Sequence, residues 1–348
     1  MSAQTQIRGV ELLRMADVVT PMALRAAATL RLADLIAGGA HEAGEIAAAT
    51  NCQPRPLRKL LEHLCALGVL REEPPGSYEV DELGFPLLSE NDHLGVRPFL
   101  DIDHVVGRAE LSLVEILHTL RTGGPAYEGA HGRNLWDDLD GGVAVGGMEA
   151  FVRTNPGFDA DLIVDGYDWS AVESVVDVGG NSGALVSALL RAHPHLRATL
   201  VDLPCFARMA ERSLELAGLA DRCQVVGSSF FDPLPPGADV YLVSAILADW
   251  DDDRAIAILR RCAEAAGDGG VVLLAEVHLS AAHADPVERT AVALRLEASM
   301  GNPDRTVSDL EALAAGAGLE VAWRGLDSPV RSVMALRPVQ VAAGRSAR

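Results

Sequence analysis

Two aspartates end neighbouring apolar segments in the second half of the chain, in a pattern typical of nucleoside binding. In VVDVGGNSGAL (residues 175–185) Asp177 precedes a glycine-containing turn, and in TLVDLP Asp202 follows 25 residues after Asp177. Glycine lets a backbone approach a ligand closely, and a helix beginning near Gly183 would offer free N–H groups. The Asp202 carboxylate could accept hydrogen bonds from a ribose diol. NAD-dependent enzymes share this pattern, although the GxGxxG order is absent, so it indicates a nucleotide-like ligand without identifying one.

A second segment that could carry chemistry is VSAILADWDD (residues 243–252), where an acidic turn containing Trp follows an apolar strand. Asp249 is its candidate catalytic residue. Elsewhere, His131 lies on a glycine-rich loop beside Arg133 and is the best histidine candidate for a general base, although a surface or structural histidine is the commoner case.

The elements that must position these residues alternate between strand and helix from about Val175 onward. Expected strands cover residues 174–179, 197–203, 223–228, 238–247 and 269–279. Continuous apolar strands separated by helices predict a doubly wound, mostly parallel sheet. Ligands of such sheets bind at the carboxyl ends of the strands. Residues 320–338 predict two further strands that form a closing hairpin.

Residues 8–125 have a different rhythm, with apolar residues at helical spacing. A helix, a turn and a second helix are followed by a short hairpin in REEPPGSYEV (residues 71–80), an order that resembles a winged helix. DNA binding would need a basic stripe, but Arg55, Arg58 and Lys59 are followed by acidic residues. We therefore favour a helical module that is solvated or forms a dimer.

Composition narrows the classes of function. A chain of 348 residues, of which 49% are hydrophobic, is long enough for two domains with sizeable cores. Its formal net charge of −20 makes nucleic acids and anionic membranes poor partners. No segment reaches the roughly 20 apolar residues that cross a bilayer, and no signal peptide is recognisable. The five cysteines have neither a CxxC pair nor a zinc spacing, so we expect reduced thiols, no metal site and a cytoplasmic location.

The motifs together resemble one enzyme family over nearly the whole chain. TPMALRAAATLRLADLIA, LWDDL, VVDVGGNSGAL, GSSFFDPLP and LADWDDDRAIAILRRCAEAAGDGGVVLLAEV occur in that order. They resemble the class I S-adenosylmethionine-dependent O-methyltransferases of bacterial secondary metabolism, in particular the naphthoate O-methyltransferases of enediyne biosynthesis. The resemblance implies an α/β fold with a doubly wound, Rossmann-like methyltransferase domain in residues 166–340. It also implies connecting helices that line the pocket in 126–165 and an all-α, winged-helix-like dimerisation domain in 1–125, and hence a homodimer.

The resemblance further implies the ligands and the residues that hold them. The cofactor would be S-adenosylmethionine, or S-adenosylhomocysteine as its product, and the acceptor a small aromatic or polyketide-type molecule. Cofactor contacts would come from Asp177, Gly179, Asn181, Gly183, Asp202, Leu203, Ser229, Phe230, Ser244 and Trp250. Acceptor contacts would come from Trp136, Phe151, Arg153, Asn155, Ala248 and Met300.

The candidate catalytic residues are His131, Asp249, Glu297 and Asp304. Glu297 lies four residues, about one helical turn, after Ala293, where relatives often have an acid, and Asp304 matches the acid that often precedes an arginine. As alternatives, Glu297 could belong to a solvated helix face and Asp304–Arg305 to a surface turn or a helix cap.

Two residues depart from the family pattern. Asn181 replaces a glycine of the turn, so either asparagine tolerates the unusual backbone angles nearly as glycine does, or cofactor binding is weakened or altered. Ala248 replaces the histidine that takes the proton of the acceptor hydroxyl. General-base help adds typically 10²–10⁴-fold, whereas alignment with an electrophilic sulfonium methyl already supplies a large part of the rate. A phenol also ionises more readily than an alcohol.

These observations lead to three hypotheses. The first is an S-adenosylmethionine-dependent O-methyltransferase that tailors an aromatic or polyketide-type natural product, mainly by proximity. The second is a methyltransferase-fold enzyme repurposed for decarboxylation, hydroxylation or cyclisation. The third, a non-catalytic partner or DNA-binding regulator, is disfavoured by the acidic charge.

Overall fold

The computed structural model describes residues 3–140, 157, 159–278, 281, 284–301 and 305–339. They form two compact units, one with the described residues up to Leu111 and one with those from Ser112 onward. The domain limits at residues 125 and 165 stay a prediction. Within these ranges no helix has both the length and the apolar character needed to cross a membrane. All five cysteines have free thiols.

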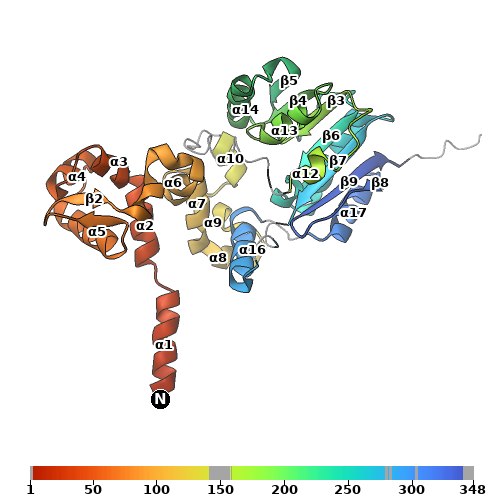
Figure 1. The fold of residues 1–348 in the computed structure, drawn as a ribbon. Helices are drawn as coiled ribbons and strands as arrows, with labels where there is room; N and C mark the ends of the chain where they lie inside the picture. The colour runs from red at the N-terminus through yellow and green to blue at the C-terminus, as the bar shows by residue number, and fades with distance from the viewer. Residues whose placement is uncertain are drawn as a thin grey trace, which may run out of the picture. The chain divides into compact units, whose positions relative to one another are not determined.

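The first unit consists of short helices and one hairpin (Figure 1). Its elements are α1 (Ala3–Met15), α2 (Val19–Thr29), α3 (Leu32–Ala37), α4 (Ala43–Thr50), α5 (Pro54–Ala66), β1 (Leu70–Glu72), β2 (Tyr78–Val80), η1 (Glu82–Leu87), η2 (Ser89–Leu94), α6 (Val96–Leu100) and α7 (Val105–Leu111). α5 buries Leu57, Leu61 and Leu64, which share one helical face. Because β1 and β2 pair antiparallel directly after α4 and α5, the predicted helix, turn, helix and hairpin are confirmed.

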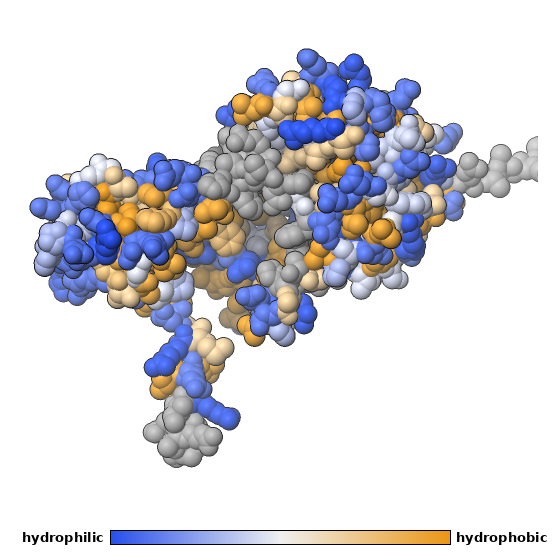
Figure 2. All heavy atoms as spheres, viewed as in Figure 1, coloured by the Kyte–Doolittle hydropathy of each residue, from blue (hydrophilic) through white to orange (hydrophobic). Residues whose placement is uncertain are grey.

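Large apolar side chains lie exposed near the N-terminus of this unit (Figure 2). Val10, Leu12, Leu13 and Met15 on α1, and Val18 before α2, are each more than half accessible to solvent. A solitary solvated helix is expected to be mostly polar, and large apolar side chains left exposed mark sites of association. This surface therefore suits burial against another protein.

The second unit is built on a seven-stranded sheet (Figure 1). Its strands are β3 (Ser174–Val178), β4 (Arg197–Asp202), β5 (Cys223–Gly227), β6 (Val240–Ser244), β7 (Val271–Val277), β8 (Leu319–Arg324) and β9 (Arg331–Pro338). They lie in the order β5-β4-β3-β6-β7-β9-β8. The first five in this order are parallel, and β9 is antiparallel to β7 and β8. The predicted doubly wound sheet and its closing hairpin are confirmed.

Helices cover both faces of this sheet. The elements outside the strands are η3 (Ser112–Glu115), α8 (Ile116–Thr122), α9 (Ala126–His131), α10 (Leu135–Asp140), α12 (Asp161–Val164), α13 (Ala184–Ala192), α14 (Pro204–Ala217), η4 (Ala220–Arg222), η5 (Leu247–Asp249), α15 (Asp252–Ala266), α16 (Pro286–Met300) and α17 (Val307–Gly316). α12, α13 and α14 pack Ile163, Leu189 and Leu214 into the core on one face. α15 and α17 pack Ile258 and Leu310 into the core on the other.

β6 is shorter than the sequence predicts. It ends at Ser244, three residues before the expected end at residue 247. Ala245 has a φ of 56°, a left-handed conformation that does not continue an extended strand. The chain therefore leaves the sheet directly after β6 and forms the η5 turn at Leu247–Asp249.

Candidate active site

A cavity of about 760 Å³ lies at the carboxyl ends of β3, β4 and β6. α10, α13, α14 and α15 complete its wall, together with the first residue of β9. This is the edge of a doubly wound sheet where ligands bind. Of the residues proposed from the sequence, the wall contains Trp136, Asp177, Gly179, Asn181, Asp202, Leu203, Ser229, Phe230, Ser244, Asp249 and Trp250.

The turn between β3 and α13 has the left-handed backbone angles that its glycines predict. Gly179 has a φ of 78°, and a β-carbon there would lie 2.3 Å from Cδ1 of Ile246. Gly183 also has a φ of 78° and caps α13, although it is not part of the cavity wall. Asn181 has a φ of 51°, a conformation that asparagine adopts more readily than most residues. The backbone therefore favours the first of the two alternatives for Asn181, namely that the turn is retained.

Two buried carboxyl groups face this turn. Asp177 and Asp202 are 2% and 6% exposed. Burial, and then the charge of Asp202, raises the pKa of Asp177 to about 7. Burial raises the pKa of Asp202 to about 6, against the opposing effect of hydrogen bonds from the N–H groups of Asn181 and Leu203, at 2.7 Å each.

Oδ2 of Asp177 has no hydrogen-bond partner in the described part of the chain. A buried carboxylate oxygen without a partner is costly, so this atom suits a ligand that brings a donor or a positive charge. The two acids and the glycine turn thus fit a cofactor with a ribose diol and a cationic amino-acid end.

Aromatic rings form another part of the cavity wall. The rings of Trp136 and Trp250 are stacked, with centroids 5.9 Å apart and planes at 28°. Phe230 and Phe231 meet Trp250 edge-on, at centroid distances of 6.0 and 4.9 Å. The guanidinium of Arg254 lies 5.4 Å from the Trp250 ring centre. Such a set of rings suits flat ligands, because stacking rewards a planar π-system.

The η5 turn brings a carboxyl group to the cavity. Burial, followed by the negative charges of Glu276 and Asp202, raises the pKa of Asp249 well above its ordinary value. Glu276 of β7 lies buried behind the turn and accepts the N–H of Leu247 at 2.8 Å. Ala248, between Leu247 and Asp249, is 7% exposed and is not among the residues that line the cavity. Its role toward the acceptor stays a prediction.

Three other candidates lie apart from the described cavity wall. His131 ends α9 as an exposed residue whose ring packs on Tyr127, with centroids 4.4 Å apart. Glu297 and Met300 lie on α16 and are partly buried, and burial raises the pKa of Glu297. Their catalytic and acceptor-binding roles remain predictions. Four further candidates, Phe151, Arg153, Asn155 and Asp304, lie outside the described residues.

Arg305 corrects a sequence-based alternative. If Asp304–Arg305 formed a surface turn, the side chain of Arg305 would be exposed, but Arg305 is only 7% exposed. Thr306, not Arg305, caps α17. The surface-turn prediction is therefore wrong for Arg305, because its guanidinium is buried and donates hydrogen bonds to the carbonyl oxygens of Leu247 and Trp250.

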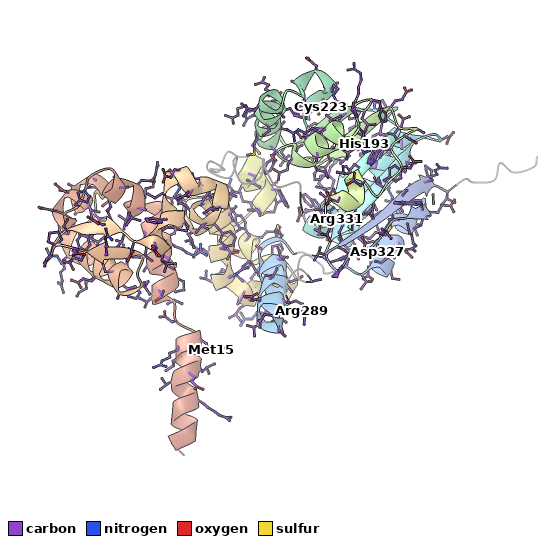
Figure 3. The ribbon with its side chains drawn as sticks, in the orientation of Figure 1. Met15, His193, Cys223, Arg289, Asp327 and Arg331 are labelled. Atoms are coloured by element: carbon purple, nitrogen blue, oxygen red, sulfur yellow. The ribbon has the colours of Figure 1, made fainter. Side chains whose placement is uncertain are left out.

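Sequence reasoning also missed Arg331, the first residue of β9 (Figure 3). It is 1% exposed and lines the cavity. Its Nη1 donates to Oγ of Ser244 at 2.9 Å and to the carbonyl oxygen of Ala275 at 2.8 Å. Burial lowers the pKa of Arg331, while the charges of Glu276 and Asp159 act in the opposite direction. An arginine at the start of a strand has no local sequence signal that separates it from a surface charge.

Comparisons with known proteins agree with this geometry. A family model described as an O-methyltransferase domain matches residues 114–320, and one described as an O-methyltransferase dimerisation domain matches residues 13–90. A 2,7-dihydroxy-5-methyl-1-naphthoate 7-O-methyltransferase of Streptomyces carzinostaticus is 46% identical over 88% of this chain and 91% of its own. An aclacinomycin 10-hydroxylase of Streptomyces purpurascens is 39% identical over 88% and 83%.

A solved structure resembles the chain over nearly its whole length. It is an O-methyltransferase of neocarzinostatin biosynthesis in complex with S-adenosylmethionine and 2-hydroxy-5-methyl naphthoic acid. The TM-score is 0.79 at 43% sequence identity, covering 94% of this chain and 98% of that one.

Proposed function

The chain belongs to the O-methyltransferase family, and from this premise we propose that it methylates a hydroxyl group of an aromatic or polyketide-type acceptor in antibiotic biosynthesis. S-adenosylmethionine supplies an electrophilic methyl group on a sulfonium sulfur. The observation that carries the proposal is the cavity at the strand ends, where two buried acids face a glycine turn.

The cofactor end of the cavity is assigned to β3, β4 and the residues after them. Asp202 would accept hydrogen bonds from the hydroxyl groups of the ribose, as an acid at the end of a second strand does in nucleotide-binding folds. Asp177 would accept a hydrogen bond from the amino group at the amino-acid end of the cofactor, which would be the partner that its Oδ2 lacks among the described residues. Phe230 and Trp250 would hold the planar base.

The acceptor end is assigned to the rings around Trp136 and Trp250. Their stacked arrangement favours a flat, fused-ring molecule over an aliphatic alcohol. The relatives support this class, since one is named for a dihydroxynaphthoate and the solved structure holds a hydroxynaphthoic acid.

Asp249 is the residue we assign to the proton of the acceptor hydroxyl. Burial raises the pKa of Asp249, so its ionised carboxylate is a stronger proton acceptor than that of an exposed aspartate. Asp249 also lines the cavity, whereas its neighbour Ala248 has no basic group and does not line it. The rings and the turn would align the hydroxyl oxygen for attack, so that most of the rate comes from positioning.

A homodimer is part of the proposal. The match of residues 13–90 to a dimerisation domain and the exposed apolar side chains of α1 support it. The second copy would cover those side chains and remove them from water. A cytoplasmic location also remains a proposal.

A second candidate function has one specific observation in its favour. A relative of 39% identity is named a hydroxylase, and this chain lacks the usual histidine at Ala248. In this alternative the same cavity would hold the cofactor without transferring its methyl group.

The test combines binding with turnover. Calorimetric titration with S-adenosylhomocysteine should give saturable binding, and labelled S-adenosylmethionine should transfer its methyl group to a member of a hydroxynaphthoate panel. Asp249→Asn should reduce turnover by about 10²–10⁴-fold, while Asp268→Asn at an exposed position serves as the matched control. Binding without methyl transfer to any acceptor would favour the second candidate, and absence of binding would contradict both.

A further inference from the structure

The η5 turn and the residues after it hold two parts of the candidate site in place. Asp249 and Trp250 both line the cavity and lie side by side on this segment. Its own backbone supplies two bonds, from Asp249 N–H to the Ile246 carbonyl at 3.1 Å and from Trp250 N–H to the Leu247 carbonyl at 3.2 Å. A short turn of this kind has poorer hydrogen-bond geometry than an α-helix, so contacts from outside matter for its conformation.

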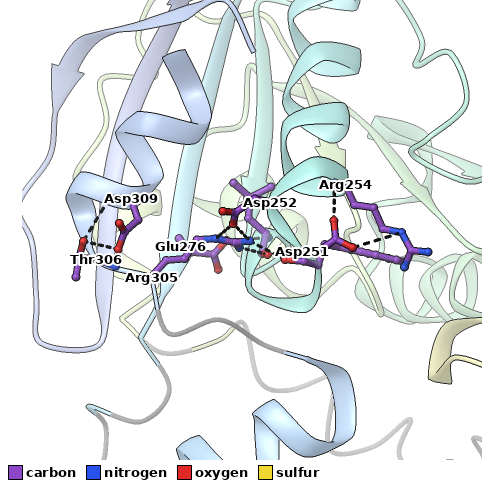
Figure 4. A network of polar contacts seen from close by, with 9 residues as sticks. Asp251, Asp252, Arg254, Glu276, Arg305, Thr306 and Asp309 are labelled. Atoms are coloured by element: carbon purple, nitrogen blue, oxygen red, sulfur yellow. Dashed lines mark hydrogen bonds and ion pairs between the residues drawn. The ribbon is translucent and has the colours of Figure 1, made fainter. Parts of the chain in front are cut away.

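Arg305 supplies such contacts from the segment just before α17 (Figure 4). Its Nη1 donates to the carbonyl oxygen of Leu247 at 2.5 Å, and its Nη2 donates to that of Trp250 at 2.7 Å. Nε and Nη2 also donate to Oδ1 of Asp252, at 3.1 and 2.8 Å. The side chain of Arg305 is 5% exposed, whereas that of Asp252 is 72% exposed. The buried carbonyl contacts therefore matter more than the exposed ion pair.

Glu276 holds the same turn as well. Glu276 accepts the N–H of Leu247 at 2.8 Å, and Arg305 takes the carbonyl oxygen of the same residue. The acidic side chain of Glu276 and the basic side chain of Arg305 thus bind the N–H and the carbonyl oxygen of Leu247, respectively. Both holding residues are buried, at 2% and 7% exposure, so water does not compete effectively for these bonds.

Arg305 is itself anchored at a helix start. The next residue, Thr306, forms a capping box with Asp309, in which the Thr306 N–H donates to Asp309 at 2.8 Å (Figure 4). At the other end of the contact, Asp251 caps α15 through the N–H of Arg254 at 2.9 Å. The guanidinium therefore connects the starts of α17 and α15 through the turn.

We propose that Arg305 is a positioning residue that fixes the turn from Leu247 to Asp252 and thereby the direction of Asp249 and Trp250 into the cavity. Arg305 is not among the residues that line the cavity, so it acts through the turn. The relevance to catalysis rests on the proposed function, but the effect on the turn does not. Its planar fork reaches two carbonyl groups at once, which the single ammonium of lysine cannot reproduce.

The first measurement follows amide hydrogen exchange in the ligand-free protein. In Arg305→Lys and Arg305→Ala, the amides of Leu247, Asp249 and Trp250 should exchange about tenfold faster or more, as expected for local opening. The matched control is Arg260→Lys, because Arg260 on α15 donates to the Gly316 carbonyl at the end of α17, at 2.8 Å. Arg260 thus joins the same two helices away from the turn, and its replacement should leave the exchange rates of these amides unchanged.

The second measurement asks whether the lost guanidinium can be replaced. S-adenosylhomocysteine should bind Arg305→Ala about three- to tenfold more weakly, because Trp250 lies on the turn, and millimolar guanidinium should restore part of the affinity. Arg260→Ala should show neither effect. Unchanged exchange in the Arg305 variants would overturn the proposal.

Two further outcomes would also count against it. Equal acceleration of exchange throughout the second unit, or loss of folding in every Arg305 variant, would assign Arg305 to global stability instead. If the wild-type protein transfers no methyl group but the turn loosens as expected, the proposed function fails and the positioning role stands.

Discussion

The backbone N–H of Asn181 donates to Oδ2 of Asp202 at 2.7 Å. The residue that replaces a glycine in the turn after β3 is therefore tied to the acid that ends β4. Because the bond uses the backbone, it does not depend on the side chain of residue 181. It explains how the turn can keep its left-handed conformation at Asn181 and still orient the Asp202 carboxylate.

Replacing Asp202 by alanine should weaken S-adenosylhomocysteine binding by about 1.5–3 kcal/mol, the range for a hydrogen bond that involves a charged group. This corresponds to roughly a 10- to 150-fold rise in Kd. Calorimetric titration measures it, with Asp268→Ala at an exposed position as the control. An unchanged Kd would mean that the cofactor binds elsewhere.

Cofactor binding should weaken as the pH falls. The pKa of Asp177 is raised to about 7 and that of Asp202 to about 6, so both acids take up protons over this window. Only the ionised carboxylates accept fully from a ribose diol or attract a cation, so the Kd for S-adenosylhomocysteine should rise between pH 8 and pH 5. Titrations at several pH values test this, and Asp202→Ala should flatten the profile. A wild-type Kd that is constant over this range would contradict the assignment.

The same two acids should make the ligand-free protein less stable as the pH rises. Their folded pKa values lie above the ordinary 3.8, so the stability they contribute is full below about pH 4 and is lost as the pH passes 6 and 7. Urea unfolding of the wild type and of Asp177→Asn measures the difference. The wild type should lose more unfolding free energy than the variant between pH 5 and pH 8, and equal losses would contradict the prediction.

Gly179→Ala should disrupt the turn far more than Asn181→Gly. A β-carbon at residue 179 would lie 2.3 Å from Cδ1 of Ile246 and would require a φ of 78° from alanine. Asn181→Gly keeps the backbone N–H that reaches Asp202. We expect Gly179→Ala to weaken S-adenosylhomocysteine binding at least tenfold and Asn181→Gly to change it by less than about threefold. Similar affinities for the two variants would contradict this view of the turn.

Restoring histidine at residue 248 tests how the reaction proceeds. If positioning supplies most of the rate, Ala248→His should leave methyl transfer within about tenfold of the wild type or raise it, because a base adds to an aligned pair. Turnover with labelled S-adenosylmethionine measures the effect. If Ala248→His loses the native turnover and neither protein transfers a methyl group, the result would instead support the repurposed enzyme.

The protein should be a homodimer in solution. The exposed apolar side chains of α1, among them Leu12 and Leu13, are otherwise left in water. Light scattering at micromolar concentration should give twice the chain mass of 36.7 kDa. Leu12→Glu with Leu13→Glu should weaken the dimer, and a wild-type monomer would remove this prediction.

The sequence by itself determined the elements and the sheet edge at which ligands bind. The apolar strands and helical segments are local patterns, so β3 to β7 could be placed from periodicity, as could the acids that end β3 and β4. Chain order and short connections then brought Asp177 and Asp202 to one edge, since parallel strands end on the same side.

Only the tertiary structure decided which distant side chains meet. Arg305 and Leu247 are 58 residues apart, and no local pattern distinguishes an arginine that reaches a buried carbonyl group from one on a surface turn. Arg331, 87 residues from Ser244, enters the cavity for the same reason. Such contacts depend on how helices and strands pack, and the free energy of burying a charge is favourable only where packing supplies its hydrogen-bond partners.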